Sequence, residues 1–206
     1  MARGILFVIS APSGTGKSSV AKRLLAGVDG IDFSVSYTTR PWRAGEQDGR
    51  EYHFVDDARF DAMAAGNGFL EWAHVFGHRY GTGREASETA LDAGRDLLLD
   101  IDVQGARKVR ESGIATVSVF LLPPDYATLE HRLRSRASDD EEQIRGRLAL
   151  ARQEAGEYRH YDYLVINDRL EQAVDDLLSI VTAERRRVAR LRADAERTLA
   201  TFPAPS

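Results

Sequence analysis

Short apolar runs alternate with amphipathic stretches along most of the chain. Residues 4–9 are almost wholly apolar and partly β-branched, which is typical of a strand covered on both faces of a parallel sheet. Residues 17–28 carry apolar side chains at helical spacing. Further strands are expected at residues 96–102, 116–121 and 163–166, each followed by a polar or proline-bearing stretch and a helical pattern. This alternation predicts a three-layer α/β fold, in which ligands gather at the carboxyl ends of the strands.

Other segments depart from this rhythm. Between about 34 and 93, short strand-like pieces at 51–55 and 69–73 lie among glycine-rich and charged turns, which indicates an inserted subdomain with mixed β structure. Residues 126 to about 158 are helical and dense in charge. Residues 170 to about 199 carry apolar side chains four apart, as a docked helix does.

Composition limits the classes of function. The 206 residues carry 28 Lys and Arg against 32 Asp and Glu, so no general attraction to nucleic acid or to an anionic membrane is expected. There is no cysteine, which excludes disulfides, thiolate metal sites and cysteine nucleophiles. No apolar run approaches the roughly 18 residues of a membrane span. These features predict a cytoplasmic protein.

A glycine-rich turn joins the first strand to the first helix, as in a phosphate-binding loop. Gly14 and Gly16 permit positive φ angles, so that backbone N–H groups can converge on anionic oxygens. Lys17 is expected to reach the β- and γ-phosphates and the Ser18 hydroxyl to bind Mg²⁺. The alternative is a Gly-Ser turn that merely opens a helix. The loop residues expected to hold ATP are Ala11, Pro12, Ser13, Gly14, Thr15, Gly16, Lys17, Ser18 and Ser19.

Ala11 stands where the usual pattern G-x-x-x-x-G-K-[S/T] has its first glycine. The substitution matters only if this position needs a positive φ or closely approaches the ligand. Because Ala11 directly follows the strand, we expect ordinary backbone dihedrals there and an intact loop.

Two features of the insertion suggest what receives the phosphate. Arg40 and Arg43 lie close together beside hydroxyl side chains and suit a phosphate monoester, although two loop arginines can also be a solvated face. Glu71 lies in an otherwise apolar stretch, where an unpartnered carboxylate is costly. Guanine offers N1–H and N2–H together to such a carboxylate, and adenine does not.

With these residues in place, the chain resembles the bacterial guanylate kinases. The matching stretches occur in family order over residues 4 to about 185, and the ordered set is far more specific than any one of them. They are residues 10–19, 35–40, 43–46, 69–73, 80–82, 99–105 and 165–168.

The resemblance implies a P-loop kinase that transfers phosphate from ATP to GMP, with a parallel-sheet core, a mixed-β GMP-binding insertion and a mobile helical lid. The whole chain, 1–206, is then one domain. Its core comprises residues 1–33, 94–125 and 159–200, the insertion about 34–93 and the lid about 126–158.

The resemblance also implies roles for single residues around GMP. Ser36, Glu71 and Thr82 would read the guanine, with Asp102 in contact. Arg40, Arg43, Tyr52 and Tyr80 would hold the GMP phosphate, although the two tyrosines suit an aromatic core equally well. Asp100, which also falls beside GMP, resembles a Walker-B carboxylate with an indirect role at Mg²⁺; its alternative is to cap the following turn.

Family members use lid arginines to reach over the triphosphate. Arg132 and Arg136 are four residues apart and so share one helical face, and Arg147 follows an acidic stretch. Without the resemblance, all three arginines would be interpreted as solvated surface side chains. Asn167 and Asp168 resemble the loop that lines the adenine pocket.

Phosphoryl transfer depends mainly on alignment and charge neutralisation. We expect Lys17, Mg²⁺, Arg132 and Arg147 to hold the γ-phosphoryl group while Arg40 and Arg43 aim the GMP phosphate. That acceptor is already anionic and needs no general base.

The sequence disfavours two other functions. A related P-loop kinase of a sugar phosphate would not need Ser36, Glu71 and Thr82 together, and a guanylate-kinase-like module that binds phosphopeptides would lack the intact Lys17 loop. The expected partners are ATP and GMP, with no nucleic acid and no membrane. The sequence leaves open whether the chain forms a homo-oligomer. It also leaves open whether the basic C-terminal helix is a solvated face, which is the favoured interpretation, or a subunit contact.

Overall fold

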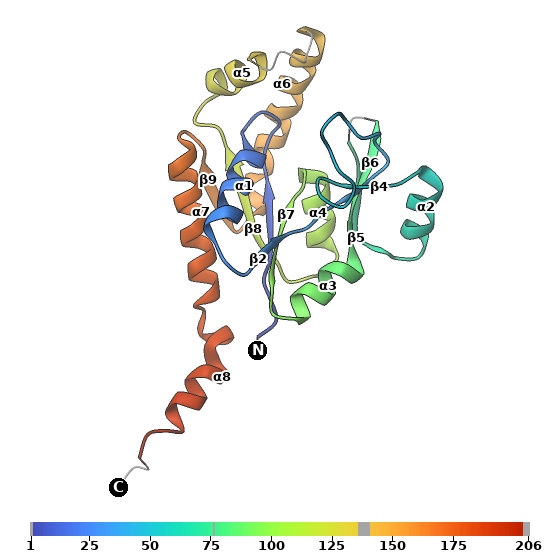
Figure 1. The fold of residues 1–206 in the computed structure, drawn as a ribbon. Helices are drawn as coiled ribbons and strands as arrows, with labels where there is room; N and C mark the ends of the chain where they lie inside the picture. Colours follow the sequence, from blue (N-terminus) through green and yellow to red (C-terminus); the bar gives the residue numbers. More distant parts are fainter. Residues whose placement is uncertain (1, 76, 136–140, 204–206) are drawn as a thin grey trace.

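The computed structural model describes residues 2–75, 77–135 and 141–203, and it confirms the three-layer α/β core (Figure 1). Five strands form a parallel sheet in the order β2-β7-β1-β8-β9. The strands are β1 (Leu6–Ser10), β2 (Ile31–Phe33), β7 (Asp96–Asp100), β8 (Val117–Leu122) and β9 (Tyr163–Ile166). The sequence had not indicated β2, a three-residue strand at the sheet edge.

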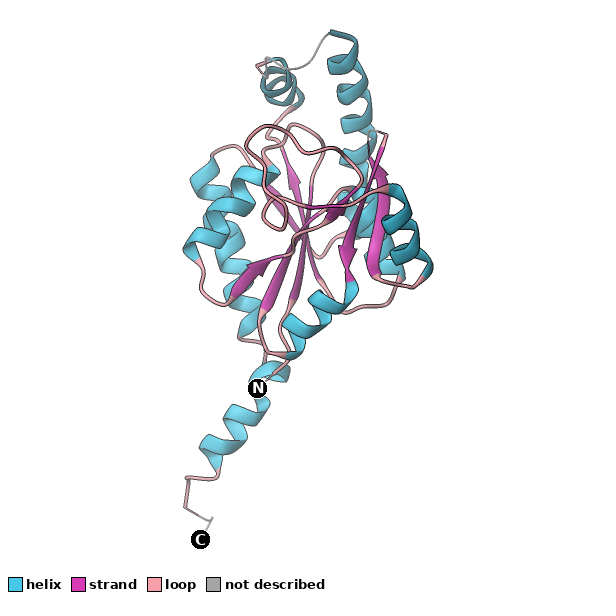
Figure 2. Cartoon of the chain, turned by 45° about the vertical axis from the view of Figure 1, so that its right-hand side comes forward, coloured by secondary structure: helices cyan, strands magenta, loops and turns pink. Residues whose placement is uncertain are grey.

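Helices cover both faces of this sheet (Figure 2). Phe7 and Ile9 of β1 point to the face covered by α1 (Lys17–Gly27) and α7 (Leu170–Arg185). Leu6 and Val8 point to the face covered by α3 (Arg84–Asp92) and α4 (Val103–Glu111). Because both sets of side chains are buried, β1 reads as a continuous apolar run rather than as an alternating one.

The insertion forms a second sheet with mixed strand directions, as expected. Its order is β4-β3-β6-β5, with β3 parallel to β4 and β6 antiparallel to both of its neighbours. The strands are β3 (Tyr37–Thr38), β4 (His53–Phe54), β5 (Phe69–Val75) and β6 (His78–Gly83). The strand expected at 51–55 is shorter because the chain turns just before it, where Gly49 N–H donates to Tyr52 O at 2.8 Å.

The insertion also contains helical structure that the sequence prediction missed. The helix α2 (Asp57–Ala65) is capped at its N-terminus by Asp56, whose carboxylate accepts from Arg59 N–H at 2.7 Å. It buries Phe60 against Phe69 and Trp72 of β5. The helix α3 then leads back to the core.

The segment expected to form a lid consists of α5 (Tyr126–Arg134), α6 (Glu141–Ala155) and the 3₁₀ turn η1 (Gly156–His160). In Figure 1, α5 and most of α6 lie beyond the carboxyl ends of the sheet strands, on the side where the phosphate loop lies. The two helices share a small apolar cluster of their own. It contains Leu129, Leu133, Ile144, Leu148 and Ala151.

The prediction of a single helix over residues 170–199 is wrong. The helix α7 ends at Arg185, and Arg187 leaves the helical conformation with ψ 135°. The helix α8 (Val188–Leu199) then starts anew and projects away from the body (Figure 1). Side-chain hydrogen bonds stabilise this break between the two helices. Glu184 accepts from Tyr163 Oη at 2.5 Å and from Arg187 Nη2 at 2.7 Å.

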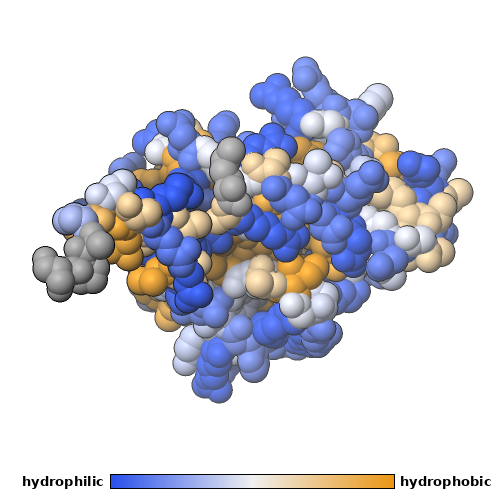
Figure 3. Space-filling view, turned by 90° about the horizontal axis from the view of Figure 1, so that it is seen from below, coloured by the Kyte–Doolittle hydropathy of each residue, from blue (hydrophilic) through white to orange (hydrophobic). Residues whose placement is uncertain are grey.

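Seen from below, the surface is mainly hydrophilic, with apolar side chains in patches that polar ones interrupt (Figure 3). No helix in the described ranges is long and apolar enough to cross a membrane.

Candidate functional site

The phosphate loop leaves the carboxyl end of β1 and leads into α1. Gly14 and Gly16 have φ angles of 90° and 94°, as expected. Ala11 keeps an ordinary backbone, because Asn67 is the only non-glycine residue with a positive φ in the described parts of the chain. The missing glycine therefore leaves the loop geometry intact.

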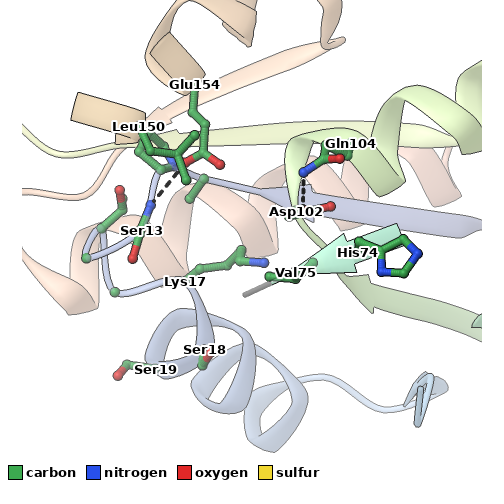
Figure 4. A pocket seen from close by; sticks show the side chains of 15 residues that line it. Ser13, Lys17, Ser18, Ser19, His74, Val75, Asp102, Gln104, Leu150 and Glu154 are labelled. Atoms are coloured by element: carbon green, nitrogen blue, oxygen red, sulfur yellow. Dashed lines mark hydrogen bonds between the residues drawn. The ribbon is translucent and has the colours of Figure 1, made fainter. Parts of the chain in front are cut away.

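A cavity of about 350 Å³ opens over this loop, and we call it the donor cavity (Figure 4). All nine residues from Ala11 to Ser19 line it, so the structure brings the whole expected loop together. The remaining lining residues come from β5, from the start of α4 and from α6. They are His74, Val75, Asp102, Gln104, Leu150 and Glu154.

The loop is joined to β7 by Asp100. The Asp100 carboxylate pairs with the Lys17 ammonium and accepts from Ser18 Oγ at 3.1 Å, while Lys17 Nζ also donates to Ile101 O at 2.8 Å. Asp102, and not Asp100, caps the next helix, since its carboxylate accepts from Gly105 N–H at 2.8 Å. The capping role that the sequence offered as the alternative for Asp100 thus belongs to Asp102.

A second cavity of about 280 Å³ lies between the core and the insertion, and we call it the acceptor cavity. Six of the residues expected around GMP line it: Ser36, Tyr52, Glu71, Tyr80, Asp100 and Asp102. The rings of Tyr52 and Tyr80 lie edge to face with centroids 5.6 Å apart. Glu51 also lines this cavity, and the sequence analysis had not selected it.

Glu71 is a buried carboxylate in the middle of β5, with 6% of its surface exposed. Its strand partner Thr82 donates from Oγ1 to Glu71 Oε1 at 2.7 Å. Burial raises the pKa of Glu71 to about 7, and the negative charge of Asp102 adds to this effect, while Thr82 and Lys108 oppose it. The apolar stretch with a single carboxylate therefore marked a real buried acid.

The start of α4 approaches Glu71 closely. A β-carbon on Gly105 would lie 2.9 Å from Glu71 Oε2 and 3.3 Å from Asp102 Oδ1, so this close approach depends on glycine. Lys108, on the same helix, donates to the Trp72 carbonyl and lies 4.5 Å from the centre of its ring. These contacts fix β5 of the insertion against the core.

Arg40 and Arg43 do not line either cavity in this structure. Arg40 is buried and binds Glu46 with two hydrogen bonds of 2.7 and 3.0 Å, and its guanidinium lies 5.3 Å from the ring centre of Tyr52. The Arg43 backbone N–H donates to the same Glu46 at 2.7 Å, while its side chain is exposed. Both arginines thus depend on Glu46, which the sequence analysis had not singled out as a partner.

Arg132 of α5 braces the loop instead of facing into the donor cavity. It donates to three backbone carbonyls, those of Thr15 at 3.2 Å, Asn167 at 3.0 Å and Asp168 at 3.2 Å. Asn167 is buried and donates from Nδ2 to the same Thr15 carbonyl at 2.7 Å. The structure therefore places Asn167 beneath the loop rather than along a lined cavity.

Of the other two lid arginines, the structure describes one. Arg147 lies half-buried on α6. Arg136 lies outside the described residues.

Glu154 is the buried residue of the donor cavity that the sequence analysis missed. It continues the buried face of α6, after Ile144, Leu148 and Ala151. A carboxylate on the apolar face of a helix is the same signal that had identified Glu71 in a strand. The dense charge of the surrounding segment concealed it.

A phosphate loop after the first strand of a parallel sheet, with a second cavity beside it, defines a phosphate-loop nucleotide-binding protein of the kinase type. The family model described as guanylate kinase matches residues 3–184. The chain belongs to the guanylate kinase family.

Two relatives and one solved structure illustrate the similarity. The guanylate kinase of Rhodopseudomonas palustris is 50% identical over 184 residues, which is 89% of this chain and 84% of that protein. That of Nitrosococcus oceani is 50% identical over 189 residues, or 92% of each. The crystal structure of guanylate kinase from Anaplasma phagocytophilum superposes with a TM-score of 0.78 at 34% identity, covering 100% of this chain and 98% of that one.

Proposed function

We propose that the chain transfers the γ-phosphoryl group of ATP to GMP, giving ADP and GDP, and that the two cavities hold the two nucleotides. Family membership supports the reaction. One observation carries the assignment of the cavities, because the donor and acceptor cavities share four lining residues, Lys17, Ser18, Val75 and Asp102. Groups bound on either side would meet at Lys17, as a direct transfer requires.

On the donor side, backbone N–H groups of the loop would hold the phosphates, and Lys17 would neutralise the transferred group. The described ranges contain no cluster of three acidic or histidine side chains that could enclose a metal. Ser18 and Asp100 nevertheless offer two adjacent oxygen ligands, which fits Mg²⁺ because this ion completes its shell with water and substrate phosphate. When bound there, Mg²⁺ supplies charge neutralisation.

On the acceptor side, the ionised Glu71 would accept from both guanine N–H groups, with Ser36 and Thr82 beside it. Asp102 would complete the contact. Tyr52 and Tyr80 line the same cavity and would hold the GMP phosphate together with Arg40 and Arg43. The phosphate oxygen that attacks is already anionic, so no residue is assigned as a general base.

The lid arginines would act after a rearrangement. Arg132 must give up its three backbone carbonyls before it can reach the triphosphate, and we assign Arg147 and Arg136 to the same task. Closing the lid and the insertion would also exclude water from the transferred group. The absence of cysteine fits the reducing cytoplasm that we propose as the site of action.

A coupled assay that follows ADP formation tests the proposal. With Mg²⁺ and ATP we expect rapid turnover on GMP, and little on AMP or ribose 1,5-bisphosphate, because neither offers the guanine donor pair to Glu71. Turnover on the sugar phosphate without turnover on GMP would refute the assignment of the acceptor cavity. Absence of turnover on every acceptor would instead favour a binding module.

A further inference from the structure

Glu154 reaches from the helix α6 into the donor cavity, next to the first turn of the phosphate loop. Its side chain points to Ser13, and Oε2 accepts from the Ser13 backbone N–H at 3.4 Å (Figure 4). Leu150, one helical turn earlier, lines the same cavity. A carboxylate oxygen thus occupies one of the backbone N–H donors of the loop.

The surroundings of Glu154 make a buried charge costly. Only 8% of its surface is exposed, and within the described ranges no ion pair joins it to a basic side chain. Burial raises its pKa, the nearby Asp102 raises it further, and the Ser13 hydrogen bond and Lys17 oppose the effect. If this position served packing alone, an apolar side chain would stabilise the fold more than a buried carboxylate does.

The Ser13 N–H is one of the donors with which such a loop binds phosphate. One N–H cannot serve a carboxylate and a phosphate oxygen at once, and the two anions repel each other at this distance. The lid also touches the loop on its other side, since a β-carbon on Gly14 would lie 2.8 Å from Leu133 of α5. A triphosphate in the loop must therefore compete with Glu154 for the Ser13 N–H.

We propose that Glu154 takes the place of a phosphate oxygen in the nucleotide-free protein, so that ATP must displace it and thereby move the helix α6. This inference rests on the proposed function of the donor cavity as the ATP site. Arg147 lies seven residues before Glu154, about two helical turns, on the same side of α6. A movement of α6 that accompanies the displacement of Glu154 would carry Arg147 with it and so link arrival of the triphosphate to rearrangement of the lid.

The test compares Glu154→Gln and Glu154→Ala with the full-length wild type by calorimetric titration of ATP with Mg²⁺ and of adenosine. Removing the competing charge should tighten ATP binding about five- to tenfold, the net value of one ordinary hydrogen bond, and leave adenosine binding unchanged. Glu142→Gln removes an exposed carboxylate from the same helix and should change neither.

Three outcomes would count against the inference. Unchanged or weaker ATP binding in both variants would overturn it, and so would an equal gain for adenosine, because the effect would then not involve phosphate. A wild type that binds no ATP would refute the proposed function and this inference with it. If the wild type turns over GMP normally and the variants bind ATP no more tightly, only the role of Glu154 fails.

Discussion

Replacing Glu71 with glutamine separates the cost of a buried charge from its use in binding. Glutamine has nearly the same shape, and its Oε1 can still accept the 2.7 Å hydrogen bond from Thr82. It does not titrate, however, and it cannot accept from two guanine donors. The substitution should therefore stabilise the free protein at neutral pH while it weakens GMP binding.

The pKa of Glu71 sets the size and sign of the effect. It rises from an ordinary 4.5 to about 7 on folding, so between these values the folded state keeps a proton that the unfolded state has lost. The wild type therefore loses stability as the pH rises from about 4.5 to 7, by about 3 kcal/mol in total. Since the variant avoids this loss, we expect its advantage to grow by about 2.5 kcal/mol between pH 5 and pH 8.

Urea unfolding of both proteins at pH 5 and pH 8 measures this difference, with the exposed Glu142→Gln as a control. In parallel, the wild-type KM for GMP should rise about tenfold per pH unit below pH 7, because only the ionised carboxyl accepts both guanine N–H groups. The variant should show a high KM that this titration no longer changes. An equal stability difference at both pH values would refute the burial argument.

Other substitutions test the remaining parts of the site. Lys17→Ala should lower turnover by several orders of magnitude with an unchanged circular dichroism spectrum; near wild-type turnover would contradict its role. Arg43→Met should raise the KM for GMP without changing stability, whereas Arg40→Met should also lower the unfolding free energy by about 1–2 kcal/mol, because its acidic partner loses two hydrogen bonds. Gly105→Ala should raise the KM for GMP about tenfold and leave that for ATP unchanged, because its β-carbon would displace the Glu71 carboxylate; equal changes in both would contradict this.

Site residues that stand out from their immediate neighbours in the sequence could be predicted from the sequence. Glu71 stands out because a carboxylate in an apolar strand needs a partner, and Asp100 because it ends a buried strand beside the phosphate loop. The core sheet was predictable for a similar reason, since strands buried on both faces read as continuous apolar runs. Short or edge elements such as β2 and β4 carry too few residues to show a period.

Features that depend on contacts across the chain could not be predicted. The partner of Arg40 is six residues away, and it is paired only because the loop folds back on itself. Likewise, Arg132 meets the carbonyl of Thr15 across the fold, and the break between α7 and α8 depends on Tyr163 of β9. Spacing along the sequence gives no measure of such distances.

The charges around the two cavities bear on the proposed transfer. Within the described ranges, five carboxylates line the cavities against one lysine; they are Glu51, Glu71, Asp100, Asp102 and Glu154. Two phosphorylated nucleotides would add further negative charge at close range, where each like-charge pair costs on the order of 1 kcal/mol or more. The arginines assigned to catalysis at positions 40, 43, 132 and 147 line neither cavity in this structure. The cavities in this structure thus lack the positive charge that the proposed transfer requires, and under the proposed function a movement of the insertion and the lid would have to supply it.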